Sequence, residues 1–267
     1  MRPSVTALLL ATGLPLLPWG PEGHRLAAEA SLSTLPPGLQ SWYAGREPEF
    51  LLAALEPDLW KDQDPAEVGR HRIYSETYGG AAQVPLTAAK ARSQVSAWAF
   101  EQSGQLPWVI AERYALLVEA FQSRRPEAVV TASGWLCHYV ADAQVPLHTT
   151  RNRNGKLTGQ KGVHRRWEID LLRQGVESLP DLRLAAVPAD LPRAVSSWVV
   201  ESHALVPALL AADSAPLRQG FRRSPSAEEG PWHEQKAVAE RQLRRSAERT
   251  GDLLLAAWVE AGRPSPR

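Results

Sequence analysis

Cysteine is almost absent from this sequence, since Cys137 is the only one in 267 residues. No disulfide can form within the chain, so stability must come from a hydrophobic core or from bound metal. Neither sign of charge dominates, because 30 Lys and Arg face 29 Asp and Glu. This balance excludes a global positive field that would attract nucleic acid or an anionic membrane. Any such partner must be recognised at a local site.

Glycine-rich phosphate loops, fixed-period repeats and low-complexity tracts are also missing. Their absence argues against nucleotide-binding folds, solenoids and disordered tails. Strand patterns are scarce, whereas apolar residues recur at helical spacing, as from Ile110 to Phe121. The sequence therefore predicts an all-α protein with one compact multi-helix domain. We expect helices near 24–35, 47–56, 86–103, 107–122, 126–145, 163–175, 191–212 and 232–260, and loops at 62–70, 151–162 and 214–231.

The N-terminal segment has the composition of an export signal. A short apolar run, Leu8–Leu17, follows a basic residue and falls short of the roughly 20 apolar residues that span a bilayer. The alternative is a buried first helix, which a glycine and two prolines in or beside the run disfavour. We expect a signal peptide at 1–18, a helical domain at 19–267 and a protein that is periplasmic or secreted.

Two pairs of histidine and carboxylate residues indicate the chemistry. His138 precedes Asp142, and His164 precedes Glu168, by four residues each, which places both members of a pair on one face of a helix. His148 follows a proline that ends the first helix and turns the chain. Each pair alone could be a surface salt bridge. Together, in a chain with seven histidines, they indicate a metal cluster, and zinc binds both ligand types.

With Trp19-Gly-Pro-Glu-Gly-His24, Pro57-Asp58 and His71, this ordered set resembles the superfamily of bacterial zinc-dependent phospholipases C and single-strand-specific zinc nucleases. The resemblance runs from Trp19 to Glu168. It implies an all-helical fold with three Zn²⁺ ions in one cleft between helices. No protein partner is implied, and His203 and His233 match nothing in the motif.

The resemblance also implies which residues bind each ion. One zinc would be held by Asp58, His71, His138 and Asp142, and a second by His148, His164 and Glu168. The third would be held by the amino group and carbonyl oxygen of Trp19, with His24 and Asp142. Asp62 and Asp64 are alternatives to Asp58. The proline at 18 disfavours the cleavage that would free the Trp19 amino group, and without that ligand a two-zinc phosphomonoesterase is the alternative.

These ligands suit the hydrolysis of phosphate esters. Zinc lowers the pKa of bound water to about 7 and neutralises charge on phosphate oxygens. Asp58 would orient or deprotonate the attacking water and is the expected catalytic residue. Ligand imidazoles must be neutral, so activity should fall in mild acid, and chelators should abolish it.

The substrate divides the superfamily. Glu168, where the nucleases usually carry aspartate, and the short loop Thr149–Val163 favour a phospholipid, whereas the spacing from Trp19 to His24 favours single-stranded nucleic acid. We expect phospholipase C activity ahead of nuclease activity. Asn152 and Asn154 could contact the substrate or belong to a plain turn. Four aromatic residues could stack on a base or lie in the core: Tyr74, Tyr78, Trp135 and Tyr139.

An alternative from another class is a helical protein that binds zinc without catalysis. In such a structural site, protein ligands close every coordination position. Hydrolysis by a zinc ion that carries water distinguishes the two possibilities.

Overall fold

Helices make up the framework of the computed structural model, which describes residues 20–172, 176, 178–218 and 231–266. No strand occurs in this part of the chain, and the expected all-α fold with a single compact domain is confirmed. The α-helices are α2 (Gly20–Leu32), α3 (Pro37–Gln40), α4 (Glu47–Ala53), α5 (Glu56–Trp60), α6 (Glu67–Arg70), α7 (Ala88–Gln94), α8 (Ala97–Ser103), α9 (Leu106–Ser123), α10 (Pro126–Ala143), α11 (Val163–Arg165), α12 (Leu191–His203), α13 (Val206–Arg218) and α14 (Pro231–Glu260). The 3₁₀ turns are η1 (Ser75–Tyr78), η2 (Ala81–Gln83), η3 (Pro146–Thr149) and η4 (Lys156–Thr158), and η5 (Arg166–Asp170) is a π-helical turn.

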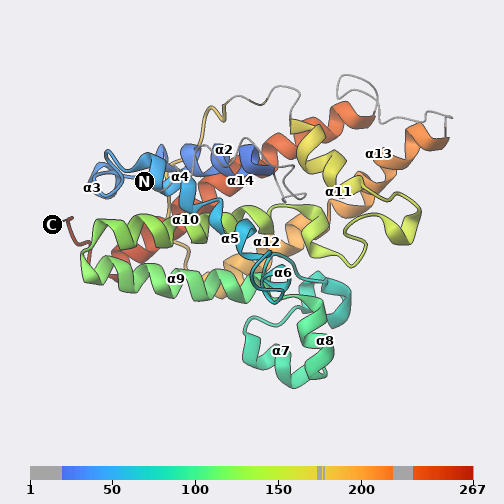
Figure 1. The fold of residues 1–267 in the computed structure, drawn as a ribbon, viewed down its shortest axis with the longest axis horizontal. Coiled ribbons are helices and arrows are strands. Elements are labelled where there is room, and N and C mark those ends of the chain that lie inside the picture. Colours follow the sequence, from blue (N-terminus) through green and yellow to red (C-terminus); the bar gives the residue numbers. More distant parts are fainter. Residues whose placement is uncertain (1–19, 173–175, 177, 219–230, 267) are drawn as a thin grey trace.

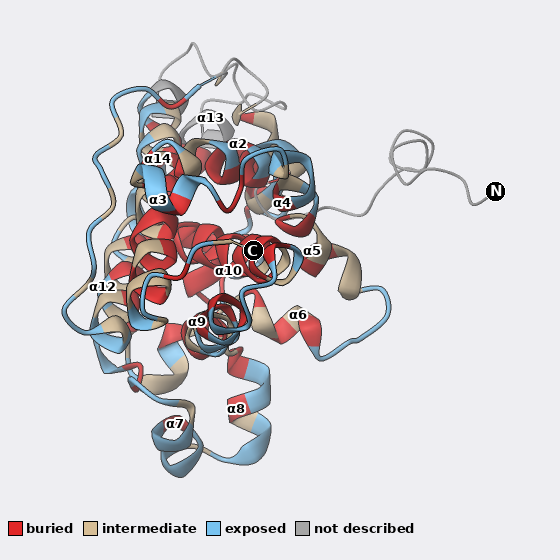
Figure 2. Cartoon of the chain, turned by 90° about the vertical axis from the view of Figure 1, so that its left-hand side faces the viewer, coloured by how far each residue is buried: buried red, intermediate tan, exposed pale blue. Residues whose placement is uncertain are grey.

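The centre of the molecule is α10, which packs against α9, α4, α14 and α2. Every residue from Leu136 to Ala143 is buried, and Figure 2 shows α10 coloured as buried along most of its length. A helix that is buried all round must satisfy its polar side chains within the protein. Arg124, in the left-handed conformation, ends α9, and Pro126 starts α10 at a position that needs no N–H donor.

Two of the expected helices are interrupted. The segment 86–103 forms two helices, because Val95 and Ser96 are extended and the Ser96 hydroxyl accepts a hydrogen bond from the Ala99 N–H at 3.2 Å. This is an N-cap, which starts a new helix. The segment 191–212 likewise divides into α12 and α13 at a turn over residues 204–205.

Two other expectations are corrected. The segment 62–70, expected as a loop, contains the short helix α6 at its end. The segment 163–175 is a single α turn that continues into the π turn η5, in which the Leu171 N–H bonds to the Arg166 carbonyl at 3.0 Å. Residues 173–175 lie outside the described residues. Of the expected loop 214–231, residues 214–218 instead continue α13 and residues 219–230 lie outside the described residues. The signal peptide expected at 1–18 also lies outside them.

The stretch Leu191–Ser214, which covers α12 and most of α13, is long and apolar enough to cross a membrane by length and composition alone, with a window of 18 residues at a mean hydropathy of 1.3. A third of that window is buried inside the protein. Val195, Trp198 and Val199 on α12 belong to the main hydrophobic core. Part of this stretch therefore packs against the folded domain.

Candidate metal centre

Eight buried or nearly buried side chains meet around the middle of α10. They are His24, Asp58, His71, His138, Asp142, His148, His164 and Glu168, and they are called the histidine–carboxylate cluster below. The side chains come from α2, α5, the residue after α6, α10, η3, α11 and η5. Of the nine expected ligands, only Trp19 lies outside the described residues.

The first group in the cluster joins α5, α6 and α10. The His71 Nδ1 atom lies 3.0 Å from His138 Nε2, and each of these nitrogens lies 3.7 Å from Asp58 Oδ1. Pro57 occupies the first turn of α5, where its fixed φ suits a helix start, so the short helix presents Asp58 inward. Asp62 and Asp64, the alternatives to Asp58, are exposed.

Asp142 connects the first group to the rest of the cluster. Its Oδ2 atom lies 2.8 Å from His71 Nδ1 and 3.4 Å from His138 Nε2. Its Oδ1 atom lies 3.3 Å from His148 Nδ1 and 3.7 Å from His24 Nε2. One carboxylate thus contacts ligand atoms on two sides. His24 also stacks on His138, with ring centroids 4.0 Å apart.

The third group is formed by His148, His164 and Glu168. The two Nε2 atoms are 3.0 Å apart, and Glu168 Oε1 lies 3.3 Å from His148 Nε2 and 3.0 Å from His164 Nε2. The pair at 164 and 168 meets although the backbone passes from an α turn into a π turn between them. Single π turns inside helices occur often at functional sites.

Hydrogen bonds outside the cluster orient two of its imidazoles. His138 Nδ1 lies 2.8 Å from the Ala54 carbonyl oxygen and must donate to it, which turns the Nε2 lone pair toward Asp58 and Asp142. His71 Nε2 faces Glu67 Oε1 at 3.3 Å, so Nδ1 is the nitrogen with a lone pair to offer. Such partners fix the tautomer of a ligand histidine.

Glu67 was missed in the sequence, although it precedes His71 by the same four residues that separate His138 from Asp142. Its buried carboxylate also accepts a hydrogen bond from the Tyr139 hydroxyl and contacts Arg70 Nε at 3.3 Å. Burial would raise the pKa of Glu67, but hydrogen bonds from His71 and Tyr139 lower it. Glu67 is therefore an ionised acceptor behind His71.

The electrostatics of the cluster keep its carboxylates ionised. Burial would raise the pKa of Asp58, but the charges of His138 and Lys61 lower it. Burial would raise the pKa of Glu168, but the charges of His164 and His148 lower it to about 2. Burial would also raise the pKa of Asp142, but the charges of His148 and His138 hold that pKa well below its usual range. Three carboxylates are therefore negative although their side chains are buried.

The imidazoles respond to the same field in two ways. Burial and the charge of His138 lower the pKa of His24 to about 3, so the His24 imidazole is neutral. Burial also lowers the pKa of His164. At His138 burial is outweighed by Asp142 and Asp58, which raise the pKa. A field that favours a proton at this point also favours a metal cation.

Zinc fits these residues. Ligand atoms at 2.0–2.2 Å from a tetrahedral zinc lie roughly 3.4 Å apart; the close contacts described above are 2.8–3.7 Å, and the ligand atoms of each group all lie within 4.8 Å of one another. The two ring nitrogens of His24 are buried without a hydrogen-bond partner among the described residues. His71 Nδ1 and His138 Nε2 lie 3.0 Å apart, and when the other nitrogen of each ring carries the proton toward Glu67 or Ala54, both present lone pairs and neither can donate to the other. A metal ion would satisfy them.

Other histidines and the candidate substrate residue lie beside the cluster. His203 Nδ1 lies 3.1 Å from the Thr149 hydroxyl and belongs to none of the ligand groups. The side chain of His233 is outside the described residues. Asn154 lines a cavity that also contacts His164. Its side-chain oxygen accepts a hydrogen bond from the Gly162 N–H at 3.0 Å.

An all-helical fold around buried histidines and carboxylates defines a metal-dependent protein. The family described as zinc dependent phospholipase C matches residues 23–203. The chain therefore belongs to the zinc-dependent phospholipase C family and is a zinc-dependent enzyme of the phosphodiesterase type. The expected superfamily is confirmed. No curated protein matches the chain.

Proposed function

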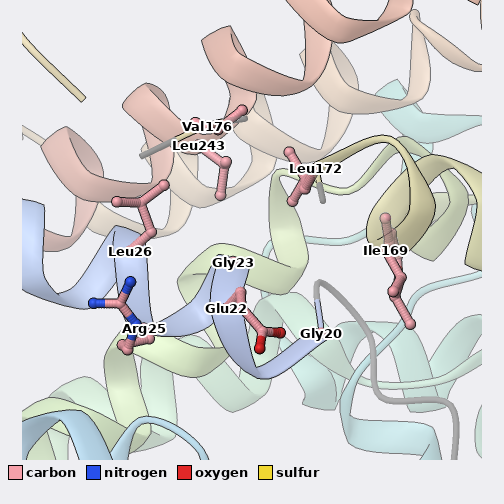
Figure 3. A pocket seen from close by; sticks show the side chains of 10 residues that line it. Gly20, Glu22, Gly23, Arg25, Leu26, Ile169, Leu172, Val176 and Leu243 are labelled. Carbon is pink, nitrogen blue, oxygen red and sulfur yellow. The ribbon is translucent and has the colours of Figure 1, made fainter. Parts of the chain in front are cut away.

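We propose that this protein is a phospholipase C, which hydrolyses the bond between the glycerol oxygen and the phosphate of a phospholipid. Family membership supports the chemistry, and one cavity beside the cluster supports the lipid substrate. That cavity, of about 110 Å³, borders Glu168 and lies between α2, η5 and α14 (Figure 3). Its lining includes five aliphatic side chains, namely Leu26, Ile169, Leu172, Val176 and Leu243.

An aliphatic lining suits lipid better than a nucleobase. Bases bound by nucleases of single strands stack on aromatic rings, which contributes roughly 1–3 kcal/mol per base. No aromatic ring lines this cavity among the described residues. Tyr139 is buried in the core, and Trp135 donates to Glu56 and packs on Trp60. Tyr78 contacts Ser103, and Tyr74 packs beneath Arg72.

We propose the ligand sets that the sequence predicts. Asp58, His71, His138 and Asp142 would bind one zinc, and His148, His164 and Glu168 a second. His24 and Asp142, with Trp19, would bind a third. Bound zinc would supply a water that is ionised near neutral pH, and the charge of the zinc would neutralise the phosphate.

The residues of the chain would then direct the reaction. The Asp58 carboxylate accepts a hydrogen bond from the attacking water and orients its oxygen toward phosphorus. Lys61, which contacts the Asp58 carboxylate, adds a positive charge close to the phosphate. The new phosphorus–oxygen bond replaces the bond to glycerol, and the proton of the water ends on the glycerol oxygen. Diacylglycerol and a phosphorylated headgroup are the products.

Hydrolysis by the purified protein tests the proposal. Phosphatidylcholine, phosphatidylinositol and single-stranded DNA are offered in parallel, with chelator and after zinc is restored. We expect zinc-dependent release of diacylglycerol, and the Asp58→Asn variant should lose most of it. Asp62→Asn is the matched control, since Asp62 is exposed four residues away, and it should retain activity. Cleavage of DNA alone would assign a nuclease. No turnover with zinc tightly bound would assign a non-catalytic zinc protein.

Export remains a proposal that rests on the apolar run Leu8–Leu17. The mature N-terminus identifies the processing site. A chain that starts at Trp19 would have the free amino group that the third zinc requires, whereas any other start would limit the enzyme to two ions.

A further inference from the structure

A second cavity beside the cluster carries positive charge. It has a volume of about 230 Å³ and borders His164. Its lining consists of Lys61, Val68, Arg153, Asn154, Gly162, His164 and Arg165. Three of these residues are cations, whereas no carboxylate and no Phe, Tyr or Trp ring line the cavity among the described residues. The cavity therefore has the chemistry of an anion site next to the proposed reaction centre.

Arg153 is the cation that is free to bind a ligand. Within the described part of the chain, its guanidinium forms no ion pair or hydrogen bond, whereas Lys61 contacts Asp58 and Arg165 faces Asp170 at 3.5 Å. Arg153 lies near His164, where its charge adds to burial in lowering the pKa of that imidazole. A planar guanidinium can bind two oxygens of a phosphate or carboxylate at once.

Asn154 complements Arg153. Because its side-chain oxygen already accepts from the Gly162 N–H, the amide has its N–H₂ group left to donate. A ligand held by both residues must supply acceptors, as an anion does. A quaternary ammonium group such as choline is bound by Trp, Tyr or Phe rings and by carboxylates, and the described lining contains none of these.

The segment that carries these residues also favours a lipid over a polynucleotide. No Asp or Glu occurs between residues 151 and 166, although Arg and Lys are frequent there. On η4, at the outer turn of this segment, Leu157 is 71% exposed. An exposed leucine among basic side chains suits contact with an anionic lipid surface.

We propose that this cavity binds a second negatively charged group in the headgroup of the phospholipid, so that the enzyme prefers substrates with an anion beyond the scissile phosphate. The inference rests on the proposed phospholipase C function and specifies its substrate class. Arg153 and Asn154 are the residues that select the substrate. The occupant is a lipid headgroup with an additional phosphate or carboxylate.

Phosphatidylinositol and phosphatidylinositol 4-phosphate differ by one phosphate and are used as soluble short-chain monomers, which removes effects of membrane binding. We expect the wild-type KM to be about tenfold lower for the phosphorylated lipid, which is the effect of one charge-assisted contact. Arg153→Gln should abolish this preference, so that the ratio of the two KM values falls to about one. Lys156→Gln removes a charge from the same loop outside the cavity and should preserve the preference. Zinc content should be equal in all three proteins.

Equal KM values for the two lipids in the wild type would overturn the inference, as would a preference that survives in Arg153→Gln. A KM for a dinucleotide with a second phosphate that is lower than the KM for either lipid would assign the cavity to nucleic acid and would also overturn the inference. If no phospholipid is hydrolysed, the proposed function fails, and binding still tests the cavity. Calorimetry with inositol 1,4-bisphosphate and inositol 1-phosphate on zinc-loaded protein should show the same tenfold preference, and equal affinities would refute it.

Discussion

Replacing Gly134 with alanine should destabilise the protein and weaken its metal site together. Gly134 lies inside α10, where alanine normally stabilises a helix by about 1 kcal/mol relative to glycine. Here α4 crosses α10 so closely that an added Cβ atom would lie 2.5 Å from the Ala53 Cβ and 2.8 Å from the backbone N of Ala54. Carbon atoms in contact normally lie 3.5–4.0 Å apart, so the two helices would have to separate by roughly 1 Å.

Overpacking of this kind costs about 1–3 kcal/mol, which outweighs the gain in helix propensity. The separation would also disturb the 2.8 Å hydrogen bond between His138 Nδ1 and the carbonyl oxygen of Ala54. Loss of such an orienting bond weakens zinc binding by roughly 10–100-fold. Thermal unfolding with and without chelator measures the first effect, and competition with a chromogenic chelator measures the second.

The double variant Gly134→Ala with Ala53→Gly removes the closest contact and should recover part of both losses. The reasoning would be refuted by a single Gly134→Ala variant that is more stable than the wild type, as helix propensity alone predicts. It would also be refuted by a destabilised variant with unchanged zinc affinity, because the helix crossing would then have no connection to the site.

The remaining predictions concern the cluster and its surroundings. Glu67→Gln should weaken one zinc site by roughly 10–100-fold in chelator competition, since His71 loses an ionised acceptor, whereas the control Glu112→Gln, which contacts Arg70 on its exposed side, should not. The zinc-free protein should lose stability as the pH falls below 6.5. In the folded protein the pKa of His24 is lowered to about 3, so His24 stays neutral, whereas in the unfolded chain it is protonated below 6.5. This difference in proton binding costs on the order of 5 kcal/mol of folding stability at low pH. Glu168 adds to the loss between pH 4.5 and about 2, because its depressed pKa stabilises the fold only while it is ionised. Denaturant titration across pH measures both effects, and a His24→Asn variant with the same slope between pH 6.5 and 5 would contradict the first.

Local spacing predicted much of the candidate site. The pairs at 138 and 142 and at 164 and 168 each needed only the repeat of a helix, and both pairs meet in the structure. The π turn did not separate the second pair, because the two side chains still project to the same side. Glu67 follows the same spacing rule but was missed, since the polar residues before it indicated a loop.

The features that the sequence did not predict depend on contacts between distant segments. The break between α7 and α8 could have been indicated locally, because Ser96 is a favourable N-cap residue. The apolar pattern, however, continues through Ser96 and predicted one uninterrupted helix. The orientation of His138 by Ala54 depends on how α4 crosses α10, which no short motif encodes. The cavity that brings Lys61 to Arg153 likewise joins segments far apart in the chain. Such features require the packed structure.

The position of Asp142 has a consequence for how the enzyme is assembled in the cell. One of its oxygens contacts His71 and the other faces His24 and His148, so with the proposed ligand sets an ion bound on one side would fix the carboxylate for an ion on the other. Loading should therefore be cooperative, and partly filled enzyme should be scarce at any zinc supply. When zinc is limiting, the number of active enzyme molecules would fall, while the activity of each active molecule would stay the same.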